Sequence, residues 1–179
     1  MKKTIKDVEI GSKFKFGAIE FVKLDNICCG SLCLTTDVLF EDCFDKDDQN
    51  NWITSSLREK LARVIRKYIK NMDALLPFVR DLTTDDGQLK YGSCTDVVSL
   101  LTCNEYRKYR KFIPNCGKWY WTITADSIKY LCSIRYITPD SIRYITPGGS
   151  LLSEHAFICY GGVRPLCVLK SGTVVEVEE

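Results

Sequence analysis

A seven-residue segment occurs twice in tandem and constrains how the last third of the chain can fold. Residues 133–139 and 141–147 both read Ser-Ile-Arg-Tyr-Ile-Thr-Pro, and only Asp140 separates them. Isoleucine, tyrosine and threonine favour strands, and proline is excluded from the interior of a sheet. The repeat therefore predicts two short strands with turns. Because surface loops tolerate added residues, we expect so short a duplication to lengthen an exposed loop or hairpin.

Two hydrophobic blocks flank the repeat. Trp119-Tyr120-Trp121 precedes it, and Gly-Gly-Val-Arg-Pro-Leu-Cys-Val-Leu follows it at residues 161–169. Side chains two apart share one side of a strand, so the two tryptophans are expected as core anchors on the same side, with Tyr120 pointing the other way. We expect Arg164 to be structural, paired with a carboxylate or with backbone carbonyls. A rigid frame around a polar and aromatic insert is typical of a binding face.

The candidate binding residues lie between these two blocks. Tyrosine and arginine combine a large contact area with directional hydrogen bonds and cation–π contacts, which suits recognition. The alternative is that isoleucines and tyrosines of the repeat only pack a hairpin, and for the tyrosines both interpretations stay open. The expected ligand-binding residues are Tyr130, Arg135, Tyr136, Arg143, Tyr144, His155, Phe157 and Tyr160.

Length and composition favour one globular domain. The 179 residues are 45% hydrophobic and 27% charged, which is ordinary for a soluble chain. We expect three regions within a single domain: a strand meander (1–50), a helical part (51–118) and a β-rich part (119–179).

The net charge of +2 does not require a nucleic-acid or membrane partner. No signal peptide or membrane span is apparent, so a cytoplasmic protein is expected, with association to a virion as the alternative.

Ten cysteines occur without a secretory leader, which favours reduced thiols over a disulfide scaffold. Cys33, Cys132, Cys159 and Cys167 lie among aliphatic residues, where a thiol is a small buried hydrophobe. The chain has a single histidine and no pair of cysteines spaced as in C-x-x-C. We therefore expect no structural metal and no cofactor.

Hydrophobic alternation predicts an antiparallel meander in the first forty residues. Apolar residues recur two apart at Val8 and Ile10, Phe14 and Phe16, Ile19 and Phe21, and Leu32 and Leu34, and the pattern ends near Phe40. Residues 41–51 are acidic and predict a solvated loop. They lack the glycine and the terminal glutamate of a calcium-binding loop.

Two capping boxes predict helix starts. Ser56 and Glu59 precede an amphipathic pattern through Ile69, and Thr102 and Glu105 begin a helix over about 103–112. The outer face of the first helix is basic, so it offers either a site for phosphates or acidic proteins or simply a solvated surface. Its charged residues are Arg58, Lys60, Arg63, Arg66, Lys67 and Lys70.

Four separated blocks resemble one uncharacterised domain family common in gut Firmicutes and their phages. Residues 51–58 resemble its W-x-x-S-x-L-R helix start, and residues 98–106 resemble its V-F-L-L-S-x-x-E-Y segment. Trp119-Tyr120-Trp121 is similar to its tryptophan-rich strand, and residues 162–166 are similar to its closing G-V-R-P-A/L. That family is similar to C-type-lectin-like folds of the formylglycine-generating-enzyme type, which include the variable proteins of diversity-generating retroelements. The resemblance implies an α+β, C-type-lectin-like domain with its ligand face within residues 122–162.

We expect a non-catalytic domain, encoded by a phage or prophage, that recognises a protein or surface ligand. His155 is the only histidine available as a base and has no evident orienting partner, which argues against an enzyme. The calcium motifs E-P-N and W-N-D of sugar-binding lectins are absent from the sequence. The alternative is an intracellular phage effector or inhibitor that acts on host nucleic-acid-handling machinery through its basic helices.

Overall fold

The largest sheet begins as a meander near the N-terminus. The computed structural model describes residues 1–128 and 141–177. Strands β2 (Lys13–Phe16), β3 (Ile19–Ile27) and β4 (Gly30–Thr35) are successive antiparallel neighbours, which confirms the predicted meander at these positions. Gly17, in the β2–β3 turn, has φ +63°, a left-handed conformation that glycine adopts without strain.

Strands from later in the chain complete this sheet. β14 (Leu166–Lys170) pairs with β4, with β6 (Leu75–Leu76) and with β9 (Val98–Ser99). β15 (Val174–Glu176) lies between β1 (Lys2–Thr4) and β2. The order is β1-β15-β2-β3-β4-β14-β6, so strands from all three predicted regions share one sheet.

The strand predicted around Val8 and Ile10 is wrong. Ile5–Asp7 forms a 3-10 helix, η1. The buried side chain of Lys23 donates through Nζ to the carbonyl of Ile5 at 2.8 Å and to that of Val8 at 2.6 Å. Because an ammonium group satisfies these carbonyls, the segment needs no neighbouring strand there.

A second sheet contains the tryptophan block and the second heptapeptide. It has five strands in the order β12-β11-β10-β13-β5, and all neighbours are antiparallel except β10 and β13. The meander was predicted to continue to Phe40. That part of the prediction is wrong, because the strand that begins at Phe40 belongs to the second sheet and pairs with β13. The strands are β12 (Leu151–His155), β11 (Ser141–Ile145), β10 (Tyr120–Ala125), β13 (Gly161–Val163) and β5 (Phe40–Asp42).

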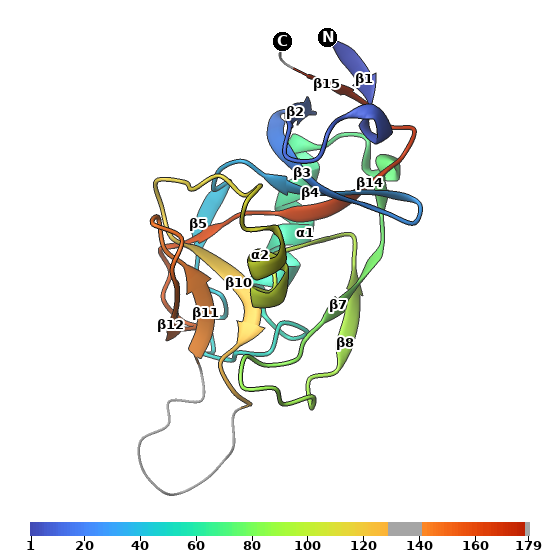
Figure 1. Cartoon of the computed structure of the whole chain (residues 1–179). Helices are drawn as coiled ribbons and strands as arrows, with labels where there is room; N and C mark the ends of the chain where they lie inside the picture. The colour runs from blue at the N-terminus through green and yellow to red at the C-terminus, as the bar shows by residue number, and fades with distance from the viewer. Residues whose placement is uncertain (129–140, 178–179) are drawn as a thin grey trace, which may run out of the picture.

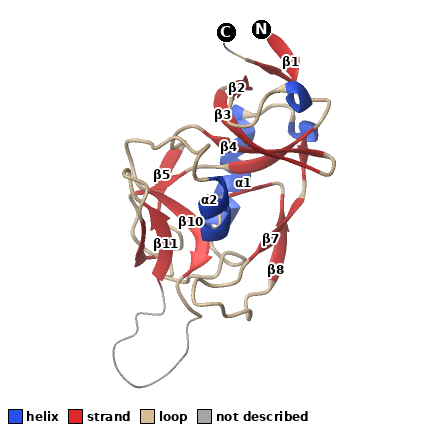
Figure 2. Cartoon of the chain, viewed as in Figure 1, coloured by secondary structure: helices blue, strands red, loops and turns tan. Residues whose placement is uncertain are grey.

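The second heptapeptide copy supplies β11, and the first copy lies outside the described residues. Figure 1 shows β11 next to β10 in one layer, while β7 (Phe78–Asp81) and β8 (Ser93–Asp96) form a separate hairpin on the other side of the view. A second 3-10 helix, η2 (Met72–Ala74), precedes β6. The fold is thus α+β, as predicted, with two α-helices and curled, mainly antiparallel sheets in the described residues (Figure 2).

Helix α1 (Ser56–Tyr68) has a different N-cap from the predicted one. Ser55 is the N-cap: its Oγ accepts from the N–H of Leu57 at 3.1 Å and donates to the carbonyl of Phe44 at 2.5 Å. The predicted capping box of Ser56 and Glu59 is therefore wrong. The apolar face forms as expected, with its buried residues at Leu57, Leu61 and Ile65.

The acidic loop before α1 is not wholly solvated as predicted. Asp45 is only 4% exposed. Its carboxylate accepts hydrogen bonds from the backbone N–H groups of Asp47, Gln49 and Ser56 at 2.9–3.2 Å. A carboxylate at the first turn of a helix complements the helix dipole, so Asp45 ties the loop to α1.

The capping box of α2 (Cys103–Tyr109) is confirmed. Thr102 Oγ1 accepts from the N–H of Glu105 at 3.0 Å, and the Glu105 carboxylate accepts from the N–H of Thr102 at 2.8 Å. The helix ends before the predicted residue 112. A tighter turn follows, in which the N–H of Phe112 donates to the carbonyl of Tyr109 at 2.9 Å.

The helices contribute to different hydrophobic clusters. One cluster contains Leu61 of α1 with Cys33 and Cys167 of the large sheet. The other contains Tyr106 of α2 with Leu34 of the same sheet. Alternation along β4 explains this division, because Cys33 and Leu34 point to opposite faces. Both sides of the large sheet are therefore covered.

Of the four cysteines that were predicted to be buried, two are buried in the structure. Cys33 and Cys167 are buried free thiols, as predicted. Cys159 is exposed, so its predicted place in the core is wrong. Cys132 lies outside the described residues.

Neither α-helix in the described part of the chain is long and apolar enough to cross a bilayer.

Candidate functional site

A chain of aromatic rings runs from the core to the surface of the five-stranded sheet. It begins at Trp52, whose ring centroid is 5.7 Å from that of Phe44, and Phe44 lies 6.1 Å from Trp121. Trp121 contacts Trp119 edge-on at 4.8 Å, so the two tryptophans share one side of the strand as predicted. Trp119 then contacts Tyr144 at 4.7 Å. Edge-to-face and tilted contacts at these distances are the favoured aromatic geometries.

Gly161 permits this close packing. A Cβ atom at Gly161 would overlap the indole of Trp121 and would lie 2.8 Å from Cη2 of Trp119. The Nε1 of Trp121 donates to the carbonyl of Asp42 at 2.9 Å, which fixes the ring against β5. The indoles are thus held by the backbone of two neighbouring strands, and they form a rigid base for the residues above them.

The outer end of the chain forms the aromatic surface cluster, which we define as Trp119, Tyr144, Leu152 and Tyr160. Tyr160 is 62% exposed and contacts Trp119 edge-on at 5.8 Å. Leu152 is 48% exposed and lies directly opposite Tyr144 in the β11–β12 pair. Directly opposed residues share one face of a sheet, so Leu152 and Tyr144 point the same way.

The phenol of Tyr144 stays protonated well into the alkaline range. Burial raises its pKa above the ordinary value, and the nearby Glu154 and Tyr160 add to the rise. At neutral pH the Tyr144 hydroxyl is a neutral hydrogen-bond donor and acceptor beside the rings of Trp119 and Tyr160 and the side chain of Leu152.

His155 and Phe157 form a neighbouring pair. Their ring centroids are 5.5 Å apart, and Phe157 is 48% exposed. Asp48 binds Phe157 and lies near His155: its Oδ1 accepts from the N–H of Phe157 at 3.2 Å, and its Oδ2 is 3.7 Å from Nδ1 of His155, too far for a hydrogen bond. The acidic loop thus supports the segment that leads from β12 to Tyr160.

Arg143 points away from the aromatic surface cluster. It neighbours Tyr144 on β11 and so faces the opposite side of the sheet. Its guanidinium contacts Asp126 at 2.6 Å and Asp85 at 3.0 Å, and Asp85 also pairs with Arg107 of α2 at 3.0 Å. This network joins β11 to α2 and to the β7–β8 loop.

The remaining predicted binding residues, Tyr130, Arg135 and Tyr136, lie outside the described residues. The structure therefore brings Tyr144 together with Tyr160 and His155 together with Phe157, and it separates Arg143 from them.

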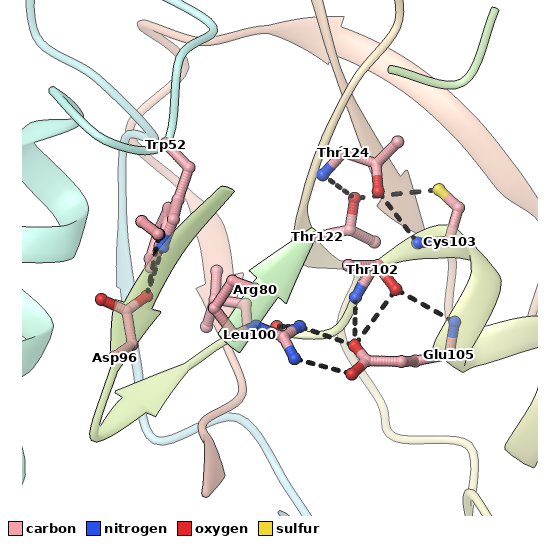
Figure 3. Close-up of polar contacts among 10 residues, drawn as sticks. Trp52, Arg80, Asp96, Leu100, Thr102, Cys103, Glu105, Thr122 and Thr124 are labelled. Atoms are coloured by element: carbon pink, nitrogen blue, oxygen red, sulfur yellow. Dashed lines mark hydrogen bonds and ion pairs between the residues drawn. The ribbon is translucent and has the colours of Figure 1, made fainter. Parts of the chain in front are cut away.

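A largely buried polar network connects the β7–β8 hairpin with both helices, and Figure 3 shows part of it. Arg80 is 2% exposed and donates two hydrogen bonds of 2.6 Å to the Glu105 carboxylate and one of 2.8 Å to the carbonyl of Leu100. Trp52 Nε1 donates to Asp96 at 2.7 Å, and Asp96 also pairs with Arg58 at 2.8 Å. A two-pronged arginine–carboxylate pair fixes orientation, so this network holds the β7–β8 hairpin to both helices.

A groove of about 820 Å³ runs beside α1 and is the second candidate site. Arg58 and Arg66 of α1 line it, together with Val97 and Lys170 from the sheet side. Arg58 is engaged with Asp96, and Lys60 pairs with Asp42. The exposed basic residues of α1 that form no ion pair with any described residue are Arg63, Arg66 and Lys67, and Lys70, just after the helix, also forms none.

Sequence reasoning missed two members of the aromatic surface cluster. Leu152 follows Leu151 and precedes Ser153, and only its pairing with Tyr144 reveals its place. Trp119 was expected in the core, whereas it is only half-buried and contacts Tyr160. Strand alternation from Trp121 placed Trp119 on the correct face, but it could not show that Trp119 lies where that face meets the surface.

Comparisons of the chain with protein-family models, with curated proteins and with solved structures find no significant match. The resemblance to the Firmicutes and phage domain family stays a prediction.

Proposed function

We propose that the protein is a non-catalytic recognition domain that binds a protein ligand through the aromatic surface cluster. The observation that supports this most is the position of Tyr160, which is 62% exposed yet contacts Trp119 at 5.8 Å. An exposed aromatic side chain on a rigid aromatic base loses little conformational entropy on binding. Tyrosine and tryptophan are also the residue types that contribute most to protein interfaces.

The composition of the cluster favours a protein over a highly charged ligand. Leu152 and Tyr160 supply exposed apolar area, and Tyr144 supplies a neutral hydroxyl. A charged group next to this apolar area is Glu154, which shares the face of β12 with Leu152 and lies close enough to raise the pKa of Tyr144. An apolar centre with polar groups at its rim is typical of protein interfaces.

We also propose a C-type-lectin-like arrangement for the β-rich part. It is supported by the antiparallel β10–β11–β12 unit, which begins within the tryptophan block and precedes the closing Gly-Val-Arg-Pro segment. In such an arrangement the cluster belongs to the ligand face implied by the sequence resemblance.

The test compares partner binding by the parent chain and by a Leu152→Ser, Tyr160→Ser variant. Both side chains are about half or more exposed, so the free energy of unfolding should change by less than about 1 kcal/mol. The matched control is Val79→Ser, which removes an apolar side chain that is 69% exposed on β7. A partner retained by the parent and the control but lost by the cluster variant supports the proposal. Equal retention by all three chains contradicts it.

A second function, binding of an acidic partner along α1, is supported by a separate observation. Arg63, Arg66 and Lys67 are exposed, and none pairs with a described residue. Replacing the three by serine would abolish salt-sensitive binding if this surface were the site. The cluster proposal predicts that this variant binds its partner as the parent does.

A further inference from the structure

Two adjacent thiols lie at the tip of the β3–β4 hairpin, away from the aromatic surface cluster. Cys28 and Cys29 form the two-residue turn between Ile27 and Gly30, which are paired across the hairpin. Both cysteines are exposed free thiols, and their sulfur atoms are 3.6 Å apart. No other role in the fold or in the proposed function uses them.

The backbone of this turn is held in place by β14 and the turn that follows it. The N–H of Ser171 donates to the carbonyl of Cys29 at 3.2 Å. A Cβ atom at Gly30 would overlap the carbonyl oxygen of Leu169 and would lie 2.8 Å from Cγ1 of Val168, so glycine allows the close approach of β14. The two thiols therefore project from a fixed turn, as a preorganised binding site requires.

The sulfur separation matches a chelate better than a disulfide. Two zinc–sulfur bonds of about 2.3 Å at a tetrahedral angle place the sulfur atoms about 3.8 Å apart. A disulfide requires about 2.0 Å, so the sulfurs would have to approach by a further ~1.5 Å. The observed 3.6 Å lies close to the tetrahedral value.

We propose that Cys28 and Cys29 together bind a thiophilic divalent cation, Zn²⁺ or Cd²⁺, as a two-thiolate chelate. Binding displaces one proton from each thiol, and the cation neutralises the two neighbouring negative charges. In the free protein, the hydrogen bond from the Cys29 thiol to Cys28 and the charge of that neighbouring sulfur raise the pKa of Cys29. The other coordination positions face solvent, where water or an external ligand completes the tetrahedron.

The experiment titrates the fully reduced full-length chain with Cd²⁺ and follows the thiolate-to-cadmium charge-transfer absorption. The parent should bind through two thiolates, and Cys28→Ser or Cys29→Ser should each weaken binding about 100-fold, because one of two linked ligands is lost. Cys116→Ser is the control, since Cys116 is a partly exposed free thiol on another loop whose Sγ donates to the carbonyl of Lys118. It should leave the titration unchanged.

Alkylation mapping on the parent chain gives a readout that needs no variant. Cd²⁺ should protect Cys28 and Cys29, but not Cys116, from an alkylating reagent when the modified peptides are identified by mass spectrometry. Absorption of equal strength in the Cys28→Ser, Cys29→Ser double variant would overturn the proposal. So would equal alkylation of the pair with and without the cation.

Discussion

At the scale of single residues, Arg164 shows what the sequence could and could not predict. Its structural role was predicted and is confirmed, because the side chain is 1% exposed and donates to backbone carbonyls. The partners could not be predicted, since they come from three separate segments of the chain. They are the carbonyls of Thr35, Thr36 and Pro114 and the hydroxyl of Tyr120, at 2.7–3.1 Å.

Replacing Arg164 by lysine should lower the free energy of unfolding by about 3 kcal/mol. Lysine keeps the charge but cannot reach several divergent acceptors at once, so buried carbonyls lose their partners. Urea unfolding measures the change. Arg63→Lys, on the exposed face of α1, is the control and should stay within about 0.5 kcal/mol of the parent. Equal stability of both variants would show that the Arg164 network contributes little.

Tyr120 should make the protein less stable at alkaline pH. Burial raises the pKa of its phenol to about 12, whereas an unfolded tyrosine ionises near pH 10. Between these values the unfolded chain loses a proton that the folded chain keeps, so the free energy of unfolding falls as pH rises. The fall should reach roughly 2–3 kcal/mol by pH 12 and should be smaller in Tyr120→Phe. Identical pH dependence of urea unfolding in the two chains would contradict this.

At the scale of elements, local signals predicted α2 better than α1. The capping box of α2 needs only Thr102 and Glu105, which are three residues apart. In α1, the N–H of Ser56 donates to Asp45, eleven residues upstream. This tertiary hydrogen bond replaces the local one to Glu59 that the predicted capping box would have made. The predicted strand near Val8 failed for the same reason, because Lys23 satisfies the carbonyls from a distant position.

The two serines at the start of α1 should therefore differ in their contribution to stability. Ser55→Ala removes the N-cap and its bond to Phe44 and should cost about 1–2 kcal/mol. Ser56→Ala removes one bond, to the exposed N–H of Lys46, and should cost about 0.5 kcal/mol or less. Thermal unfolding of both variants measures the difference. A larger loss of stability in Ser56→Ala than in Ser55→Ala would indicate that Ser56 is the N-cap and would contradict this account.

A chain that lacks residues 133–140 should fold and keep nearly the parent's stability. It retains one complete heptapeptide, which supplies β11, and residues 126–132 remain to connect it to β10. The shorter connection costs less closure entropy, by under about 1 kcal/mol. Circular dichroism and urea unfolding test this. Loss of the cooperative transition would mean that one copy does not suffice for the sheet.

At the scale of the whole molecule, the α+β class was predictable and the strand order was not. Hydrophobic alternation gave most strands of the meander, but β1 pairs with β15 and β5 pairs with β13 across most of the chain length. Such pairings depend on tertiary packing and carry no local pattern. The same limit applies to the candidate site: Tyr144 and Tyr160 were predicted from composition, whereas Leu152 joins them only through the sheet register.

The most direct test of the central claim places a photo-activated cross-linking residue at position 152 of the full-length chain, in cells that express it. The recognition proposal predicts that a discrete protein partner is cross-linked from position 152, is not cross-linked from the matched exposed position 79, and disappears when Tyr160→Ser is added. A partner cross-linked equally from both positions, or one that persists in the Tyr160→Ser chain, would contradict binding through the aromatic surface cluster.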